Sequence, residues 1–284
     1  MATEKSLLVG GKRVKLVNGK KLKSLTFNGK TYEFSTSKTY DSVLANNSWA
    51  DIQEGLRAGN PAGWQVGNTK PLTLTNGDTY TIRLVDLQEG RYVSTDGVKC
   101  KATFEFVELI KGVTHAINSS SKTYEGVTNY TAGGWLNSDM RTYMNGSDLL
   151  GKFPSDLASV MLSAKVGSAS YGGSGKTNTT AGGVIIYSDG DKLFLAAASE
   201  LFKVNATWEY NSMEIEYPQF DYYKTYNANN YREKNQLGST SHNIYWNRSP
   251  GYRSTSDVCA VNDDGSAIGG STTATYGVAP CFAL

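Results

Sequence analysis

The last forty residues of the chain, Tyr245 to Leu284, constrain the fold most strongly. The segment opens with the aromatic pair Tyr245-Trp246, continues through a polar, glycine-dotted middle, and becomes apolar again from Tyr276 to Leu284. Its last charged residue is Asp264, so the final twenty residues carry no charge. A chain end that is apolar to its last residue predicts a strand docked into the core rather than a free tail.

Alternation within the last seven residues predicts which side chains are buried. Val278, Pro280, Phe282 and Leu284 fall on one side, as a half-buried strand requires. Pro280 has no N–H group, so we expect it at an edge or at an irregular point of the ladder.

The three cysteines, Cys100, Cys259 and Cys281, do not have the spacing of a metal site. Cys281 lies in the apolar final strand and is interpreted as a small buried side chain. A disulfide between Cys259 and Cys281 is the alternative.

Length and charge narrow the class of protein. A chain of 284 residues suits one large domain plus a small one. It is 39% hydrophobic and 19% charged, which is typical of neither a disordered chain nor a membrane-embedded one, and no run approaches the roughly 20 apolar residues of a membrane helix. The net charge of +2 argues against a nucleic-acid partner. No apolar stretch of a signal peptide follows Met1 to Lys5, so we expect synthesis in the cytoplasm.

The chain contains 30 glycines and 18 tyrosines beside many Ser, Thr and Asn residues. This composition is typical of a loop-rich β protein. The same residue types dominate adaptable binding surfaces, because tyrosine provides contact area at a low entropy cost. An ordinary extracellular-type β surface is the alternative explanation.

Residues 1–40 are predicted to form a small β-hairpin module that serves anchoring or assembly. Asn18-Gly19 follows two short apolar runs, and Asn28-Gly29 lies between two others. Asn-Gly beside alternating apolar residues is a strong hairpin signal. A piece this small has little core of its own, so we expect it to pack against a partner, another copy or the main domain. The polar stretch from Ser35 to Tyr40 is the predicted linker, and residues 41–284 form the second predicted domain.

The first helix of the second domain is predicted from its N-cap. Ser48 precedes Trp49, Ile52 and Leu56 at helical spacing, and Gly59 marks the end.

Further elements follow along the chain. The pattern predicts a hairpin over 71–87 with its turn at Asn76-Gly77, a strand within 102–109, a loop over 111–132, helices after Ser138 and from Ser155, an exposed mobile loop over 167–183, a buried strand at 193–195, a short helix within 218–231, and strands in the tail. Helices combined with a mostly antiparallel, loop-rich sheet indicate an α+β fold.

Several phrases in fixed order carry a resemblance to a known family. They are Trp246-x-Arg248-Ser249-Pro250, Val261-Asn262-x-Asp264-Gly265, Tyr276-Gly277-Val278-x-Pro280-x-Phe282, and upstream Gly133-Gly134-Trp135, Ser138 to Tyr143, Pro154 to Leu157, and Asp191 to Leu195. Over roughly residues 48–284 the chain resembles a domain of unknown function that is common in phages and gut Firmicutes. The resemblance implies a C-type-lectin-like fold and binding through the C-terminal loops. It supplies no known activity.

This resemblance, together with the missing signal peptide, suggests a phage virion structural protein of the fibre or decoration type. We expect it on the virion surface, where its C-terminal loops would attach to a host cell-surface glycan or protein. Residues 1–40 would bind other virion proteins, and a homo-oligomer, for example a trimer, is expected. The alternatives are a purely architectural decoration protein without a ligand and a bacterial surface-binding adhesin module.

The predicted ligand-binding face lies in the C-terminal segment, because loops on a rigid scaffold are the usual place for binding residues. Its predicted members are Tyr245, Arg248, Tyr252, Arg253, Ser254, Thr255, Asp257, Asn262, Asp264, Ser266 and Ile268. For Arg248 a structural role is the alternative, in which the side chain ties down a loop carbonyl while Trp246 belongs to the core. The resemblance adds that related domains include targets of programmed sequence variation in this region.

No catalytic residue, cofactor or metal is predicted. The stretch from Tyr171 to Thr177 looks like a phosphate-binding loop, but Ser170 stands where that motif needs a glycine. His115 and His242 have no second ligand at a metal-binding spacing, and neither provides an obvious base for a nucleophile.

The acidic residues are interpreted as structural or solvated. Asp189-Gly190-Asp191 and Asp263-Asp264-Gly265 are typical of turns. Glu214 and Glu216 alternate along an expected strand edge, and a two-carboxylate glycosidase is the less favoured alternative.

Calcium-dependent sugar binding is not expected despite the lectin-like resemblance. In the calcium site of such lectins a Trp-Asn-Asp run supplies ligands, whereas this chain has Trp246-Asn247-Arg248. A cation in place of a carboxylate is incompatible with holding a divalent ion there.

Overall fold

The computed structural model describes residues 6–9, 12–15, 24–27, 29–33, 38–170, 184–202, 217–251 and 254–284. The chain divides into two units, residues 1–40 and 41–284. This division falls at the end of the predicted linker. Within the described ranges, no helix is long and apolar enough to cross a membrane.

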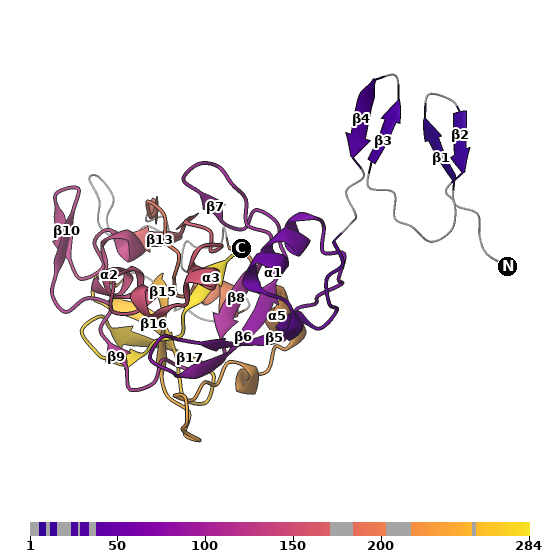
Figure 1. The fold of residues 1–284 in the computed structure, drawn as a ribbon. Helices are drawn as coiled ribbons and strands as arrows, with labels where there is room; N and C mark the ends of the chain where they lie inside the picture. Colours follow the sequence, from indigo (N-terminus) through magenta and orange to yellow (C-terminus); the bar gives the residue numbers. More distant parts are fainter. Residues whose placement is uncertain are drawn as a thin grey trace. The chain divides into compact units, whose positions relative to one another are not determined.

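The first unit contains two antiparallel hairpins (Figure 1). Strand β1 (Ser6–Val9) pairs with β2 (Lys12–Lys15), and β3 (Ser24–Phe27) pairs with β4 (Lys30–Glu33). Gly29 has a φ of 72° at the predicted second turn, a conformation that glycine adopts without strain. The first hairpin closes earlier than predicted, because Val9 faces Lys12, and Asn18-Gly19 lies outside the described residues.

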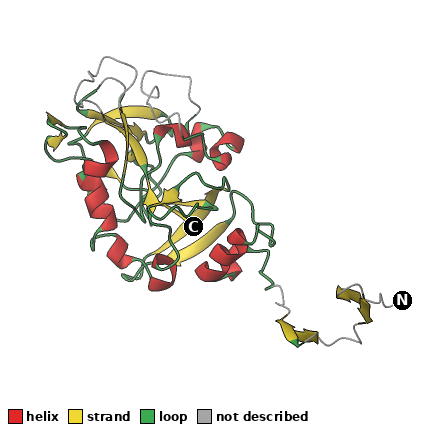
Figure 2. Cartoon of the chain, turned by 90° about the horizontal axis from the view of Figure 1, so that it is seen from above, coloured by secondary structure: helices red, strands yellow, loops and turns green. Residues whose placement is uncertain are grey.

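The second unit mixes short helices with antiparallel sheets, which confirms the α+β prediction. Its helices are η1 (Leu44–Asn46), α1 (Trp49–Arg57), η2 (Gly134–Asn137), α2 (Asp139–Asn145), η3 (Leu150–Lys152), α3 (Ser155–Ala158), α4 (Ala198–Leu201), α5 (Asp221–Thr225) and η6 (Asn229–Tyr231). Its strands are β5 (Thr69–Thr73), β6 (Thr79–Asp86), β7 (Val93–Ser94), β8 (Thr103–Phe106), β9 (Thr114–His115), β10 (Lys122–Tyr124), β11 (Val127–Asn129), β12 (Ala164–Lys165), β13 (Gly167–Ser170), β14 (Val184–Tyr187), β15 (Tyr245–Pro250), β16 (Asp257–Val261), β17 (Ala267–Ser271), β18 (Tyr276–Gly277) and β19 (Cys281–Ala283). Figure 2 shows the helices around the outside of the strands.

One sheet has the order β19-β8-β6-β5, with antiparallel neighbours throughout. The predicted hairpin forms β5 and β6, and Gly77 adopts a φ of 88° in its turn. Helix α1 begins as predicted at Ser48, whose hydroxyl accepts a hydrogen bond from the N–H of Asp51 at 3.1 Å. Trp49 on this helix packs edge-on against Phe104 of β8, with ring centroids 5.7 Å apart.

The other large sheet has the order β17-β16-β15-β18-β9. Strand β15 lies at its centre, with β16 antiparallel on one side and β18 parallel on the other. All six residues of β15 are buried. Strand β17 forms the edge of this sheet. Its Gly270 packs so closely against the Tyr276 ring that an added Cβ would lie 2.6 Å from it, which leaves no room for a side chain.

The chain ends inside the second unit, as predicted (Figures 1 and 2). Val278, Phe282 and Leu284 are 0%, 0% and 3% exposed. Both edges of β19 are occupied, since Phe282 faces Phe104 of β8 and Cys281 exchanges two backbone hydrogen bonds with Phe194. Cys281 and Ala283, whose side chains alternate with that of Phe282, are 1% and 0% exposed, so the strand is buried on both faces rather than half-buried.

Three local predictions need correction. The predicted loop over 111–132 contains β9, β10 and β11. Residues 167–170, expected in an exposed loop, form the buried strand β13, and residues 171–183 lie outside the described part. The segment 193–195 is buried as predicted, but its contact with the sheet is a single bridge from Phe194 to Cys281.

Candidate functional site

Two members of the predicted binding face, Tyr245 and Arg248, lie in the interior and cannot contact a ligand at the surface. Each is 2% exposed. The Tyr245 hydroxyl donates a hydrogen bond to the carbonyl of Arg232 at 2.8 Å. Burial raises the pKa of this hydroxyl well above its ordinary value, with the Glu105 carboxylate acting in the same direction.

Arg248 has the structural role that was the alternative. Its Nε donates to the carbonyl of Gly167 at 2.9 Å, and its Nη1 donates to the carbonyl of Leu195 at 2.6 Å. The same Nη1 lies 2.8 Å from Oε2 of Glu200, which is completely buried. Arg248 therefore neutralises a buried carboxylate and joins two chain segments to the central strand β15.

Most of the other predicted residues that the structure describes are divided between the two ends of one hairpin, while Ile268 lies within β17. Strands β16 and β17 pair from Asp257 with Ser271 to Val261 with Ala267. Residues 254–257 therefore lie at one end, and residues 262–266 at the other. Five residues of strand rise about 3.3 Å each, so the two groups are roughly 15 Å apart. One small ligand cannot contact both.

The members of the predicted face differ in exposure as well. Asp264 is exposed, whereas Ser254, Thr255, Asp257, Asn262, Ser266 and Ile268 are half-buried. Tyr252 and Arg253 lie outside the described residues.

At the first end, three loops that are distant in the sequence join through backbone hydrogen bonds. The N–H of Asn118 donates to the carbonyl of Thr272 at 3.1 Å, and the N–H of Thr272 donates to the carbonyl of Ser256 at 2.8 Å. The N–H of Tyr130 donates to the carbonyl of Thr255 at 3.0 Å. We call Tyr130 and residues 254–257 and 271–275 the loop face.

The loop face presents tyrosine and hydroxyl side chains to solvent. The Tyr130 ring is 37% exposed, and Ser256, Ser271 and Thr273 are exposed. The hydroxyls of Ser271 and Thr273 lie 3.0 Å apart and hydrogen-bond to each other. Sequence analysis missed Tyr130, because its β10–β11 hairpin lies in the segment expected to be a loop.

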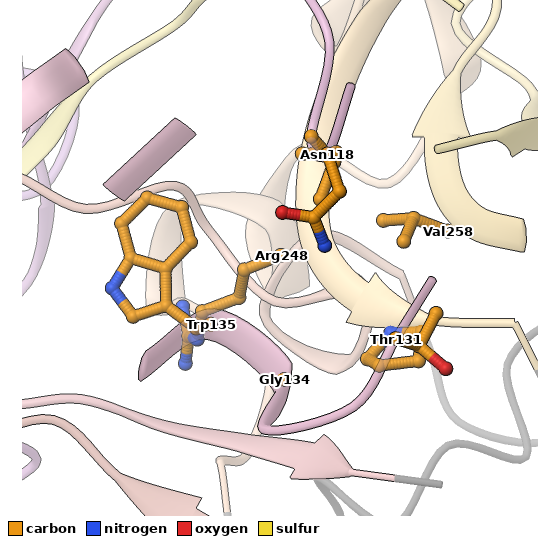
Figure 3. Close-up of a pocket in the computed structure, with 8 residues that line it drawn as sticks. Asn118, Thr131, Gly134, Trp135, Arg248 and Val258 are labelled. Atoms are coloured by element: carbon orange, nitrogen blue, oxygen red, sulfur yellow. The ribbon is translucent and has the colours of Figure 1, made fainter. Parts of the chain in front are cut away.

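A small cavity lies beneath the loop face, and Figure 3 draws the residues that line it. The cavity is lined by Ile117, Asn118, Thr131, Gly134, Trp135, Arg248, Pro250 and Val258. Its volume of about 10 Å³ is enough for one water molecule. A partner of the loop face would therefore bind on the surface of these loops rather than in this cavity.

The Gly133-Gly134-Trp135 phrase fixes the loops to β13. Gly133 and Gly134 have φ values of 82° and 53°, and an added Cβ on Gly134 would lie 2.4 Å from the carbonyl oxygen of Ala169. The N–H of Gly133 donates to the Ser170 hydroxyl at 2.9 Å. Only glycine permits this close approach of two backbones.

Asp191 is a buried carboxylate rather than only a turn residue. It accepts hydrogen bonds from Trp135 Nε1 at 2.7 Å and from Arg141 Nε at 2.8 Å. Burial raises the pKa of Asp191 although Arg141 opposes the shift. The carboxylate thus links η2 and α2 to the segment that carries Asp191.

A second buried ionic cluster surrounds Glu105 on β8. Lys234 Nζ lies 3.2 Å from its Oε2, Arg83 forms an ion pair with its Oε1, and the Tyr223 hydroxyl donates to it at 2.9 Å. Burial raises the pKa of Glu105, but the two cations outweigh this effect and lower the pKa overall. No periodicity in the sequence signals such a cluster, because its members come from distant segments.

Each histidine considered for catalysis contacts a different residue. The His115 ring stacks on Tyr143 at 4.7 Å, and His242 Nδ1 lies 3.1 Å from a carboxylate oxygen of Glu233 near the surface. Asp263 and Asp264 are exposed in a turn.

Some of the residues weighed for chemistry lie outside the described ranges, namely Glu214, Glu216 and residues 171–177. Within the described ranges, no three His, Cys, Asp or Glu side chains gather as a metal site. Cys100, Cys259 and Cys281 are buried, and no disulfide joins Cys259 to Cys281.

A wider hollow of about 320 Å³ lies at the surface and is lined by Arg91, Val93, Lys165, Tyr187 and Tyr217. Its Arg91 guanidinium is already bound to Asp86 at 2.8 Å and 3.0 Å and to the carbonyl of Pro218. The Tyr217 hydroxyl is also occupied, because it accepts a hydrogen bond from the N–H of Gly167 at 2.9 Å.

Comparison with known proteins identifies the family. A family model described as a domain of unknown function, DUF6273, matches residues 109–284, which confirms the expected relation to such a domain over that range. No curated protein and no solved structure matches the chain. The matched range includes the loop face, β15 and the buried C-terminal strand, and it covers more than half of the sequence. The chain belongs to the DUF6273 family.

Proposed function

We propose that residues 41–284 form a recognition domain of a phage virion protein, which binds a ligand on the host cell surface through the loop face. The observation that carries this proposal is the loop face itself. Three loops with exposed tyrosine and hydroxyl side chains are joined by backbone hydrogen bonds and rest on a packed framework.

The physical advantage of this arrangement is preorganisation. Loops that are ordered before binding lose less conformational entropy when a partner docks, so more of the contact energy contributes to affinity. Tyr130 offers a large ring with few rotatable bonds, and the hydroxyls of Ser256 and Thr273 can donate or accept hydrogen bonds. Such a surface suits a glycan or a polar protein epitope.

The virion assignment rests on the resemblance to phage and Firmicutes domains. Residues 1–40 form a separate unit, which is compatible with a role in anchoring to other virion proteins or in homo-oligomer formation. The C-type-lectin-like architecture belongs to the same proposal. It is supported by the α+β fold and by a C-terminal strand held in the core.

The test is binding of the fluorescently labelled full chain to a panel of Firmicutes cells, measured by flow cytometry. We expect saturable binding to at least one strain. Tyr130→Ala should weaken it about tenfold, which corresponds to about 1.4 kcal/mol. Val98→Ala is the matched control, since Val98 is 40% exposed outside the loop face. Equal binding by the Tyr130 variant would refute the assignment.

A purely architectural decoration protein predicts a different result. No saturable binding to any strain, together with loss of particle stability when the protein is deleted, would favour that role. Incorporation into particles of a chain that lacks residues 1–40 would refute the proposed anchoring by the first unit.

A further inference from the structure

Three tyrosines in and between α5 and η6 form a cluster at the other end of the β16–β17 hairpin, and two of them are exposed. The ring centroids of Tyr222 and Tyr226 are 4.7 Å apart, and those of Tyr226 and Tyr231 are 5.0 Å apart with planes inclined at 45°. Tyr226 and Tyr231 are 37% and 39% exposed, whereas Tyr222 is buried beneath them. We call these three residues the tyrosine platform.

The platform is held from below. The Arg83 guanidinium lies 4.0 Å from the centroid of the Tyr222 ring, and its Nη1 donates to the Tyr222 hydroxyl at 2.9 Å. Arg83 is itself fixed by the buried carboxylate of Glu105. The lowest ring of the cluster is therefore locked by the ionic network under the sheet.

The loop that carries Tyr231 is fixed as well. Arg232 Nη2 donates to the carbonyl and the side-chain oxygen of Asn227 at 2.9 Å and 3.1 Å. The turn of the β16–β17 hairpin packs directly against η6. An added Cβ on Gly265 would lie only 2.0 Å from the carbonyl oxygen of Asn229. The two exposed rings thus stand on an ordered backbone.

The chemistry around the rings favours a neutral, hydroxyl-rich ligand. Asn227, Asn229 and Asn230 are exposed beside the platform, and amides can both donate and accept hydrogen bonds. The nearest charged pair on α5, Asp221 and Lys224, is joined at 2.8 Å and so offers little net charge to a ligand. The exposed carboxylates of Asp263 and Asp264 lie in the turn that packs against η6, which disfavours an anionic sugar.

We propose that the tyrosine platform binds a pyranose ring of a neutral glycan. The C–H groups of a sugar ring carry partial positive charge and pack against the electron-rich face of an aromatic ring. Tyr226 and Tyr231 provide two adjoining faces for this contact, while the asparagine amides lie within the same surface to bind hydroxyls. A protein hot spot would instead be expected to bury its aromatic anchors in a desolvated pocket.

This site is separate from the loop face and does not depend on the proposed function. The two surfaces occupy opposite ends of a hairpin of five-residue strands, roughly 15 Å apart. Variants at Tyr130 and at Tyr231 therefore report on different sites.

The test is saturation-transfer NMR on the full chain with neutral tetrasaccharides of glucose, mannose, galactose and N-acetylglucosamine. Each is used at about 10 mM, which is ten times a Kd of about 1 mM. We expect transfer to the ring protons of at least one sugar. Tyr231→Ala should weaken that binding about tenfold or more, while Tyr231→Phe, which keeps the ring face, should change it by less than about threefold.

Two results complete the test. Tyr130→Ala should leave sugar binding unchanged, and the melting temperature of the Tyr231 variants should match that of the parent, because Tyr231 is an exposed side chain. Absence of saturation transfer to all four sugars, or undiminished transfer in Tyr231→Ala, would overturn the proposal. Capture of a protein partner that Tyr231→Ala abolishes, with no sugar binding, would assign the platform to protein docking instead.

Discussion

Replacement of Phe282 by alanine should remove a large part of the free energy that stabilises the second unit. The Phe282 ring is 0% exposed and stacks on Phe104, with centroids 5.3 Å apart and planes inclined at 11°. It also meets the edge of Trp49 at 5.6 Å. The substitution therefore removes the aromatic contacts that join the last strand to β8 and α1.

The magnitude follows from these contacts. Truncation of a buried phenylalanine costs about 3–5 kcal/mol, and the cost rises when the site cannot collapse. The two aromatic pairs each contribute about 0.5–1.5 kcal/mol beyond burial of area. We therefore expect a loss of about 4–5 kcal/mol, which is a large part of the roughly 5–15 kcal/mol that stabilises a typical protein. Phe282→Leu, which keeps most of the volume, should cost about 1–2 kcal/mol.

Urea denaturation followed by tryptophan fluorescence measures this loss, since Trp49 is in direct contact with the ring. Tyr130→Ala is the matched control, because it removes a ring that is 37% exposed. It should change the free energy of unfolding by about 0.5 kcal/mol or less, as at other surface positions. A Phe282→Ala variant that loses less than about 1 kcal/mol would refute the assignment of the last strand to the core.

Two further predictions concern the buried ions. Arg248→Met should cost about 3–5 kcal/mol, because it leaves the Glu200 carboxylate short of a cation. Adding Glu200→Gln should recover part of that loss in urea denaturation, and strictly additive losses would contradict the coupling. Because the folded pKa of Glu105 lies below its ordinary value of 4.5, the stability that this carboxylate contributes is present above pH 4.5 and is lost as the pH falls through the folded pKa. Glu105→Gln should therefore flatten the decline of the melting temperature below pH 4.5. An unchanged decline would show that Glu105 is not its cause.

Local sequence signals predicted the elements whose cause is local. Ser48 caps α1, Asn76-Gly77 turns the β5–β6 hairpin, and the uncharged chain end forms a buried strand. In each case a cap, a turn or an apolar run is visible within a few residues.

The elements that were missed depend on less typical turns or on distant partners. Strands β10 and β11 join through Glu125-Gly126, both with positive φ (48° and 80°), and Glu is not among the usual residues of such a turn. Strand β9 forms only through its pairing with β18, about 160 residues later in the sequence.

The candidate site was predicted less well, for a physical reason. Tyr245 and Arg248 carry polar groups and were predicted at the ligand-binding face, yet β15 has neighbours on both edges and all six of its residues are buried. Only long-range partners such as Glu200 make a buried Arg248 tolerable, and no local pattern shows them.

Hydrogen–deuterium exchange of the full chain, alone and bound to envelope fragments from a Firmicutes strain that it recognises, tests the central claim most directly. Binding at the loop face should slow amide exchange in residues 118–131, 254–257 and 271–275, since backbone hydrogen bonds of these loops would be covered. Exchange in residues 48–57 of α1 should stay unchanged. Protection confined to other parts of the second unit, with the three loops exchanging as in the unbound protein, would contradict the account.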